Sequence, residues 1–460
     1  MLKVNLNETI AAISTSIGEG GIGIVRISGK DSLNIVKKIF VSQDEHDPLE
    51  FKTYTMHYGK IVSEGKIIDE VILTLMRAPK SYTKEDVVEI NCHGGGVVLN
   101  KILELVLAKG ARLAEAGEFT RRAFLNGRID LAQAEAVVDI IRAKTDFALK
   151  IGLEQLQGRL SSEIKQIRGQ LLDVLTFLEA QIDFPEEDSV LGQKQRIKSD
   201  LFIAWEKIRK LLIGSKSARI YKDGLHVVIC GKPNVGKSSL LNAILKQERS
   251  IVTHIAGTTR DTIEELVDLK GIPVRIVDTA GILKARDLVG RKAVMRSQQQ
   301  IKLADLVIVL FDGSKRLSKE DRRLMSQLKS KKVLAVINKI DLEQKINKEI
   351  IKNIFPHLVE LSAKKSRNIN LLEEAILNLV HQGAAWSFES VMVSNLRHTS
   401  ALVHAEKLIA EVSNSLDNGL SVEFIAQGIK DALVYLDNIL GKDFSENLLD
   451  KIFGQFCIGK

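Results

Sequence analysis

Cysteine, proline and aromatic residues are scarce in this chain of 460 residues. The three cysteines, Cys92, Cys230 and Cys457, exclude a disulfide-stapled secreted fold, and no Cys-x-x-Cys pair offers a zinc site. The presence of only 6 prolines and the lack of a repeated triplet exclude collagen-like and proline-rich fibres. Aromatic residues make up 5% of the chain, which argues against a surface that stacks the bases of single strands.

Long apolar runs are missing as well. The amino terminus lacks the basic head and apolar run of a signal peptide, and the longest apolar stretches, such as 306–311, are too short to cross a bilayer. Residues 457–460 have the cysteine spacing of a prenylation box, but Gly459 and Lys460 do not fit that box. We therefore expect a soluble cytoplasmic protein that does not bind a membrane.

Charge and length are what the composition does supply. The net charge is +8, which favours a polyanionic partner such as RNA because neutralised phosphates release counterions. Many mildly basic proteins bind no nucleic acid, so charge alone gives RNA only a slight preference. At about 150 residues per domain, the length predicts roughly three domains.

The spacing of apolar residues changes along the chain. The first part has short β-branched runs and one expected helix at 97–108, which predicts an α+β domain. Later segments repeat apolar residues every three or four positions, as helices do, and between them short buried strands alternate with helices, as in a parallel sheet. Separate helical domains on either side of the sheet remain an alternative to one discontinuous domain. The predicted domains are an α+β domain at 1–121, a discontinuous all-α domain at 122–214 and 384–460, and an inserted α/β domain at 215–383.

A phosphate-binding loop is the first chemical signal. Residues 231–238 read Gly-Lys-Pro-Asn-Val-Gly-Lys-Ser, between a strand expected at 225–230 and a helix expected at 239–245. Backbone amides and the helix N-terminus favour phosphate there, with Lys237 reaching the β- and γ-phosphates and Ser238 coordinating magnesium. The predicted contacts of this loop are Asn234, Val235, Gly236, Lys237, Ser238 and Ser239.

Three further motifs follow strands in the order expected of a guanine-nucleotide site. Asp278 ends the strand at 274–277 and can hold magnesium through water. The carboxylate of Asp341 can accept the two donors on guanine that adenine lacks. Each motif alone has a plainer reading as a turn or helix cap, but together the motifs predict GTP binding. The predicted contacts are Asp278, Thr279, Ala280, Gly281, Asn338, Lys339, Ile340, Asp341, Ser362, Ala363 and Lys364.

This order of motifs is similar to that of translation-factor-like GTPases, and Gly-Thr-Thr-Arg-Asp at 257–261 resembles the switch of the MnmE/TrmE tRNA-modification GTPases and their Era-like relatives. The resemblance implies a potassium ion beside the transferred phosphate. It implies nucleotide contacts throughout Thr253, His254, Ile255, Ala256, Gly257, Thr258 and Thr259. The implied metal ligands are Asn234, Thr253, Ile255 and Thr258 for potassium, and Ser238 and Thr259 for magnesium.

Catalysis needs a group that offsets phosphate charge and a group that orients water. A monovalent cation can replace the arginine finger that most GTPases use. Ile282 stands where Ras-like proteins place a water-orienting glutamine, and an apolar side chain cannot perform that task. The family instead uses a glutamate in Asp-x-Val-Glu, but here Gly290 occupies that position. We expect slow hydrolysis or a substitute carboxylate, with Asp287 the nearest candidate. The predicted catalytic residues of the GTPase site are Lys237, Thr259, Asp278 and Asp287.

Segments outside the GTPase motifs resemble the same family, so the resemblance covers the whole chain. Without the family, 20–23 reads as a hairpin turn and 85–86 as a solvated strand start. The His-Gly-Gly-Gly at 93–96 is similar to the oxyanion loop of lipases, but no Gly-x-Ser-x-Gly elbow accompanies it. The segments that resemble the family are 8–13, 20–29, 81–86, 93–95, 117–136 and 456–460.

The resemblance implies an amino-terminal domain that dimerises and binds a tetrahydrofolate one-carbon derivative. The implied folate contacts are Arg26, Glu85, Arg128 and Lys460. Cations can pair with the carboxylates of folate, and a glutamate can accept hydrogen bonds from its amino-substituted pterin ring. Cys457 matches the carboxy-terminal cysteine of the family, and both a nucleophile and a buried structural thiol remain open for it.

The resemblance implies a homodimeric, potassium-dependent GTPase that works with the FAD-dependent protein MnmG (GidA) in a heterotetramer. The implied reaction adds an aminomethyl or carboxymethylaminomethyl group to C5 of the wobble uridine of certain tRNAs. Two alternatives remain, namely an Era-like ribosome-assembly factor and a purely regulatory switch. The first predicts a Gly-x-x-Gly loop of the KH type after the GTPase domain, and no such spacing follows residue 383.

Overall fold

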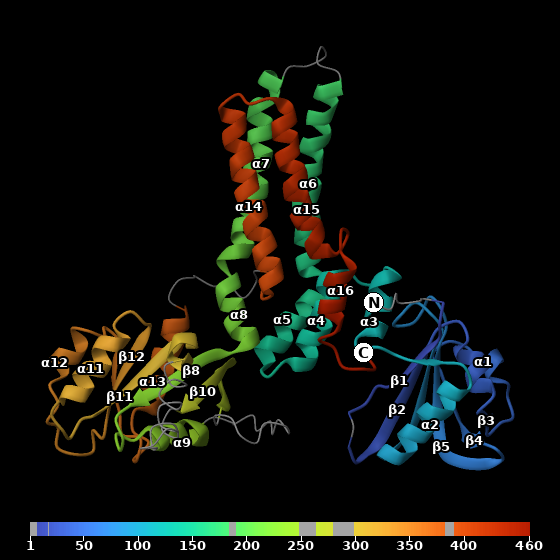
Figure 1. The fold of residues 1–460 in the computed structure, drawn as a ribbon, viewed down its shortest axis with the longest axis horizontal. Coiled ribbons are helices and arrows are strands. Elements are labelled where there is room, and N and C mark those ends of the chain that lie inside the picture. Colours follow the sequence, from blue (N-terminus) through green and yellow to red (C-terminus); the bar gives the residue numbers. More distant parts are fainter. Residues whose placement is uncertain (1–6, 17, 184–189, 248–263, 279–298, 382–390) are drawn as a thin grey trace. The chain divides into compact units, whose positions relative to one another are not determined.

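A computed structural model describes residues 7–16, 18–183, 190–247, 264–278, 299–381 and 391–460. Contacts divide the chain into two units. The first comprises Met1–Val138, Gln155–Gln166 and Leu433–Lys460, and the second comprises Asp139–Glu154 and Ile167–Ala432. Figure 1 shows the chain coloured along its sequence, with most of the helices and strands labelled.

The first unit contains a seven-stranded sheet in the order β3-β4-β5-β6-β2-β1-β7. Its neighbouring strands are antiparallel, except that β1 and β7 run parallel. The predicted α+β domain is therefore confirmed. The strands are β1 Ile10–Ile13, β2 Gly20–Ser28, β3 Phe40–Ser42, β4 Thr55–Ser63, β5 Lys66–Met76, β6 Val87–Gly94 and β7 Arg112–Leu113.

Two helices, α1 (Ser32–Lys37) and α2 (Gly96–Ala108), pack on one face of this sheet. The strands alternate because successive side chains point to opposite faces. In β5, for example, Val71 and Leu73 are buried, whereas Ile72 between them is 41% exposed. The helix predicted at 97–108 is confirmed by α2.

The last residues of the chain pack beside the start of helix α3 (Glu118–Leu125). Gly117 donates its backbone N–H to the carbonyl oxygen of Cys457 over 3.4 Å, and Ala116 forms a β-bridge with Ile458. Nearby, helices α4 (Leu131–Arg142) and α16 (Glu446–Phe453) contribute side chains to the same apolar cluster as α3. Residues more than 300 positions apart in the sequence thus share one core.

The second unit includes long helices from both sides of the GTPase motifs. Helix α7 packs against α14, and Lys198 of α7 forms an ion pair of 2.7 Å with Asp417 of α14. Lys430 of α15 likewise pairs with Glu179 of α6 over 2.9 Å. These helices run side by side in Figure 1. Their bounds are α6 Arg159–Asp183, α7 Val190–Ile213, α14 Leu396–Asp417 and α15 Val422–Leu440. The predicted domain boundaries stay a prediction.

The second unit also holds a six-stranded sheet in the order β13-β12-β11-β8-β10-β9. All its pairs are parallel except β9 with β10. The buried strands predicted at 225–230, 274–277, 306–311 and 333–337 are confirmed. The strands are β8 Leu225–Gly231, β9 Glu264–Leu269, β10 Ile272–Asp278, β11 Leu306–Asp312, β12 Val333–Asn338 and β13 Leu358–Glu360.

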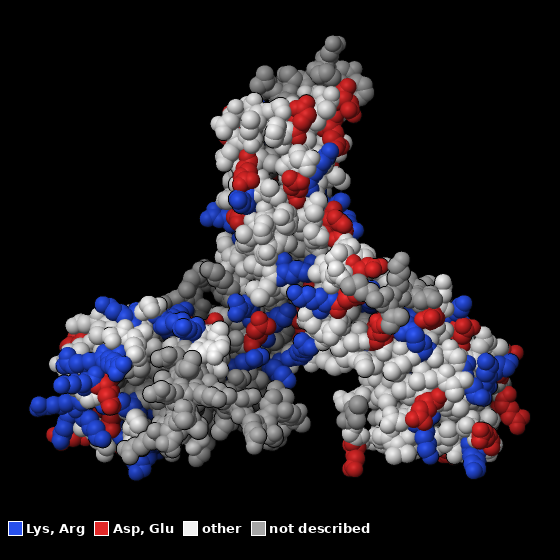
Figure 2. All heavy atoms as spheres, viewed as in Figure 1, with Lys and Arg blue, Asp and Glu red and all other residues white. Residues whose placement is uncertain are grey.

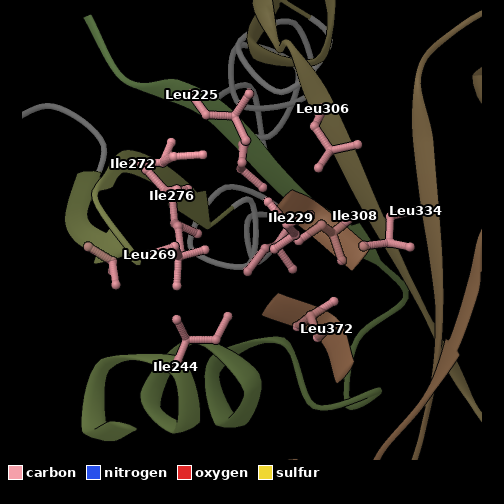
Figure 3. Packing of buried hydrophobic residues seen from close by; sticks show 14 of the residues in the cluster. Leu225, Ile229, Ile244, Leu269, Ile272, Ile276, Leu306, Ile308, Leu334 and Leu372 are labelled. Atoms are coloured by element: carbon pink, nitrogen blue, oxygen red, sulfur yellow. The ribbon is translucent and has the colours of Figure 1, made fainter. Parts of the chain in front are cut away.

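Apolar side chains cover both faces of this parallel sheet, which explains why its strands read as continuous apolar runs. On one face, Ile229 and Ile308 pack near Ile244 of α9, as Figure 3 shows. On the other face, Phe311 packs with Met325 of α11. The helices of this part are α8 Ser215–Asp223, α9 Lys237–Gln247, α11 Lys319–Leu328, α12 Lys348–Lys352 and α13 Ile369–His381.

Candidate functional site

The predicted phosphate loop connects β8 to α9, which is the strand–loop–helix context that the motif requires. Three of its residues have left-handed backbone angles: Gly231 at φ +148°, Asn234 at +64° and Gly236 at +101°. A side chain at Gly236 would collide with the amide of Asn338. The loop is therefore tight enough that glycine is required where it approaches the next motif.

Lys237 begins α9 and points back into the loop. Its ammonium donates to the carbonyl oxygens of Gly231 and Lys232, each over 2.9 Å, and the residue is only 5% exposed. Ser238 and Ser239 follow in the first turn of α9, where both are exposed. An anion at this helix N-terminus would meet the ammonium and the exposed hydroxyls together.

The guanine motif is tied directly to the phosphate loop. Asn338 donates its amide to the carbonyl oxygen of Val235 over 2.8 Å, and its own amide oxygen accepts from the backbone N–H of Ala363 over 2.9 Å. Lys339 donates to the carbonyl oxygen of Asn234 over 2.9 Å. The structure thereby brings three predicted motifs together at the carboxyl edge of the parallel sheet, where such folds bind their ligands.

An acidic residue that the sequence reasoning missed also belongs to this edge. Asp312, the last residue of β11, forms an ion pair of 2.7 Å with Lys339. Burial raises the pKa of Asp312, but hydrogen bonds from Lys339 and Ser314 outweigh burial and hold the pKa below its ordinary value. The available signal was its position, because a carboxylate that ends a buried parallel strand lies at the same edge as the other motifs.

Asp341, the residue predicted to contact the base, is exposed, and Ile340 precedes it in the same turn. Its carboxylate accepts a hydrogen bond of 2.6 Å from the hydroxyl of Ser362. This bond lowers the pKa of Asp341, so the side chain is an ionised acceptor at neutral pH. An acceptor-only group suits the N1–H and exocyclic amine of guanine. Lys364, also predicted here, is exposed two residues beyond Ser362.

The remaining predicted residues of the nucleotide site can be placed only in part. Asp278 is the last residue of β10, and its backbone is in register with Ile229 of β8, which leads into the phosphate loop. Among the residues that the structure describes, no cluster of three His, Cys, Asp or Glu side chains could hold a metal ion. The predictions for Thr253, His254, Ile255, Ala256, Gly257, Thr258, Thr259, Thr279, Ala280, Gly281 and Asp287 lie outside the described residues.

A second cluster in the first unit contains the residues expected to bind folate. Arg26 of β2 forms an ion pair of 2.8 Å with Glu89, donates to the carbonyl oxygen of Gly459 over 3.2 Å and lies 5.6 Å from the ring centre of Phe119. Arg128 lies 4.8 Å above the ring of Tyr82. Burial raises the pKa of Tyr82, and its hydrogen bond with Thr120 and the charges of Arg128 and Arg26 partly oppose that rise.

Glu85 belongs to a network on the same side of β2. Its carboxylate accepts from the hydroxyl of Ser28 over 2.7 Å and from the guanidinium of Arg122 over 3.1 Å. Arg122 is fully buried and also pairs with Glu118 over 3.0 Å. Burial alone would raise the pKa of Glu118, but hydrogen bonds from Arg112 and Arg122 lower it. The sequence reasoning missed Arg122 and Glu118 and predicted no helix over them, although their spacing of four residues is one that places two side chains on the same helical face.

The carboxy-terminal residues complete this cluster. Lys460 is partly exposed, and its backbone N–H donates to the carbonyl oxygen of Cys457 over 3.4 Å. Gly459 has φ +96°, and its carbonyl oxygen accepts from Ser14 over 3.1 Å as well as from Arg26. Cys457 is exposed, so the alternative of a buried structural thiol is wrong.

A mostly parallel sheet with a phosphate loop after β8, hydrogen-bonded to the motif that follows β12, defines a P-loop GTPase, an enzyme that hydrolyses GTP. The family described as "GTP-binding protein TrmE N-terminus" matches residues 9–128, and the family described as "MnmE helical domain" matches residues 131–457. The chain belongs to the MnmE/TrmE family of tRNA modification GTPases, as the sequence resemblance predicted.

Individual relatives agree along almost the whole chain. A protein of Clostridioides difficile named tRNA modification GTPase MnmE is 46% identical over 457 residues, which cover 99% of this chain and 100% of the relative. The protein of the same name from Thermoanaerobacter pseudethanolicus is 47% identical over 98% of this chain and 99% of its own. A solved structure of Era from Aquifex aeolicus bound to GDP.AlF4− is 29% identical over 40% of this chain and 65% of its own, with a TM-score of 0.28, too low for an argument.

Among the residues that the structure describes, no helix combines the length and apolar character that a membrane span requires.

Proposed function

We propose that this chain modifies tRNA at C5 of the wobble uridine by adding an aminomethyl or carboxymethylaminomethyl group, in a reaction coupled to GTP hydrolysis. The observation that supports this most strongly is identity of 44–47% over nearly the full length with relatives named tRNA modification GTPase. Such coverage favours tRNA modification over the Era-like alternative. In this proposal the chain is cytoplasmic, and its three domains have the predicted boundaries.

The proposal includes two partners, a second copy of the chain and the FAD-dependent protein MnmG. Support for the second copy comes from large apolar side chains on the amino-terminal sheet. Met56 and Tyr58 of β4 and Ile67 of β5 are 65%, 51% and 58% exposed. A monomer gains no stability from apolar side chains left in water, whereas a homodimer interface would bury them. The flavin partner would supply the redox chemistry that no residue of this chain provides.

Folate enters the proposal through the cluster around Arg26, Glu85, Arg128 and Lys460. Arg26 and Arg128 present two guanidinium groups for the carboxylates of a tetrahydrofolate derivative. Glu85, held by Arg122, presents a carboxylate for the amino-substituted pterin ring of the same ligand. Lys460 adds a third cation close to the carbonyl that Arg26 contacts. Cys457 remains a candidate nucleophile because its thiol is exposed beside this cluster.

Folate binding can be measured directly. In isothermal titration with 5-formyl-tetrahydrofolate, we expect Arg26→Ala to weaken binding by about 10- to 100-fold, because a charge-assisted hydrogen bond contributes about 1.5–3 kcal/mol. Lys37→Ala is the matched control, since Lys37 of α1 forms an exposed ion pair with Asp47, which lies outside that helix. No binding by the unaltered protein would remove folate from the proposal.

Potassium is proposed to lie beside the transferred phosphate, held by Asn234, Thr253, Ile255 and Thr258, while Ser238 and Thr259 hold magnesium. In support of this role, Asn234 is exposed in the phosphate loop. We expect exchange of K⁺ for Na⁺ to slow GTP hydrolysis by at least about tenfold, since a preorganised charge at the reacting phosphate is worth this much or more. In Asn234→Ala, the rates in the two salts should become equal.

The control addresses backbone strain. Asn234 has φ +64°, so alanine is strained there whereas glycine is not. Asn234→Gly should therefore lose the potassium effect as completely as Asn234→Ala if the side-chain amide binds the ion. Hydrolysis that responds equally to both cations in the unaltered protein would contradict the potassium site. Asp287→Ala in the same assay tests whether that carboxylate substitutes for the glutamate that Gly290 replaces.

A further inference from the structure

The outer side of α11 and the turns that flank it carry a concentration of positive charge. Between residues 315 and 332 the sequence has eight lysines or arginines and only two acidic residues. One of the two acids, Asp321, is buried and already paired with Lys232 over 2.6 Å. Figure 2 shows the blue side chains gathered over the region of α11 and α12. Lys332 is exposed, but its ammonium donates to the carbonyl oxygen of Leu379. We name the other exposed members the α11 cationic surface: Lys315, Arg316, Lys319, Arg322, Arg323 and Lys329.

None of these six neighbouring cations has an acidic partner within ion-pair distance among the described residues. Elsewhere on the second unit, exposed lysines commonly face a carboxylate, as Lys198 faces Asp417 and Lys407 faces Glu411. Unpaired like charges that lie close together repel each other, so this arrangement costs stability unless an anionic partner neutralises it.

The chemistry of the surface points to a phosphate backbone. Every exposed residue from 315 to 332 is polar or charged, so the surface lacks the exposed aromatic and aliphatic anchors on which protein interfaces depend. It also lacks an aromatic ring on which an unpaired base could stack. Lysine and arginine side chains in an otherwise polar surface instead match phosphates, whose neutralisation releases counterions.

We propose that the α11 cationic surface binds the phosphate backbone of the tRNA substrate. The contact is with the backbone of the paired arms, and the wobble base is held elsewhere. This inference rests on the proposed function, because the tRNA substrate is part of that proposal. It adds which surface of the protein binds the tRNA and that the contact is with the phosphate backbone.

The geometry of α11 decides which residues to change. Ser318 and Asp321 cap the helix and contact Lys232 of the phosphate loop, so altering them would disturb the nucleotide site. Lys319, Arg322 and Arg323 are exposed and make no such contact. The test variant is therefore Lys319→Gln/Arg322→Gln/Arg323→Gln in the full-length protein. We expect its GTP hydrolysis without tRNA to be unchanged.

The measurement is the affinity for an unmodified tRNA transcript between 50 and 200 mM KCl, values that span roughly the range in which phosphate contacts dominate. Each lost phosphate contact reduces the magnitude of the slope of log K against log[salt] by about one. For the triple variant we therefore expect this magnitude to fall by about two to three. We also expect the variant to bind tRNA at least about tenfold more weakly at the lower salt concentration. The matched control is Lys198→Gln/Lys210→Gln/Lys407→Gln, which removes the same charge from lysines that lie near carboxylates.

The outcomes separate the inference from the proposal beneath it. If the unaltered protein binds no tRNA, the tRNA substrate itself is wrong. If it binds tRNA and both triple variants lose affinity and slope equally, the α11 cationic surface has no special role and the inference fails alone. If the α11 variant keeps its tRNA affinity but loses binding of the purified flavin partner, the surface docks an acidic protein and the inference is overturned.

Discussion

Asp341→Asn will weaken GTP binding by about 100-fold or more. The carboxylate of Asp341, held by Ser362 over 2.6 Å, is an acceptor-only group that can face the two donors of guanine. Asparagine would present an amide N–H to one of those donors, and sites built around a specific hydrogen bond reject a mismatch strongly. Isothermal titration with a non-hydrolysable GTP analogue measures the loss.

A change of ligand provides the counter-test. Xanthosine triphosphate carries an oxygen in place of the exocyclic amine, so the asparagine variant should bind it better than it binds GTP. Glu343→Gln removes a charge two residues away, from a side chain that is 81% exposed and pairs only at the surface with Lys345, and it should bind GTP normally. Equal loss of affinity for both nucleotides in Asp341→Asn would show that the variant damages the site without changing its specificity.

Arg122→Met will lower the free energy of local unfolding around α3 by about 3–5 kcal/mol, the usual cost of leaving buried carboxylates without their cation. Arg122 is fully buried between Glu118 and Glu85, at 3.0 and 3.1 Å. Hydrogen exchange in the peptides that cover α3 suits the measurement, because a chain of several domains need not unfold in a single step.

Two companion variants decide whether charge is the reason. Arg112→Met removes the outer arginine of the same network, which is 34% exposed, so it should cost only about 1 kcal/mol or less. Adding Glu85→Gln to Arg122→Met should restore part of the lost protection, because it removes one uncompensated carboxylate. Purely additive losses in the double variant would mean that packing around Arg122, and not its charge, stabilises α3.

The GTPase site could be predicted in detail because its information is local. Each motif follows a buried strand within a few residues, and the carboxyl ends of neighbouring parallel strands meet at one edge of the sheet. The residue types at 231–238 and 338–341 therefore indicated both the ligand and the place where its parts meet. The bond from Asn338 to Val235 joins two such motifs and spans 103 positions, yet the order of the strands places it there.

The amino-terminal cluster could be predicted only as a set of separate residues. Family resemblance indicated Arg26, Glu85, Arg128 and Lys460, but nothing near them in the sequence indicated what holds them in place. Arg122 reaches Glu85 across 37 positions, and Gly459 reaches Ser14 across 445. Such contacts form only when the sheet and the carboxy-terminal segment pack together, so local patterns contain no trace of them.

The sequence alone therefore determined the class of this protein, its guanine nucleotide and the strands that carry the phosphate loop. Those strands appear as short apolar runs, and the nucleotide motifs appear as residues at fixed spacings, so both can be recognised locally. Tertiary structure decided which charges are paired. It buried Arg122 between two carboxylates, whereas the cations of the α11 cationic surface have no acidic partner among the described residues. The physical reason is that burial and pairing depend on neighbours distant in the chain, and only the packed fold brings those neighbours close.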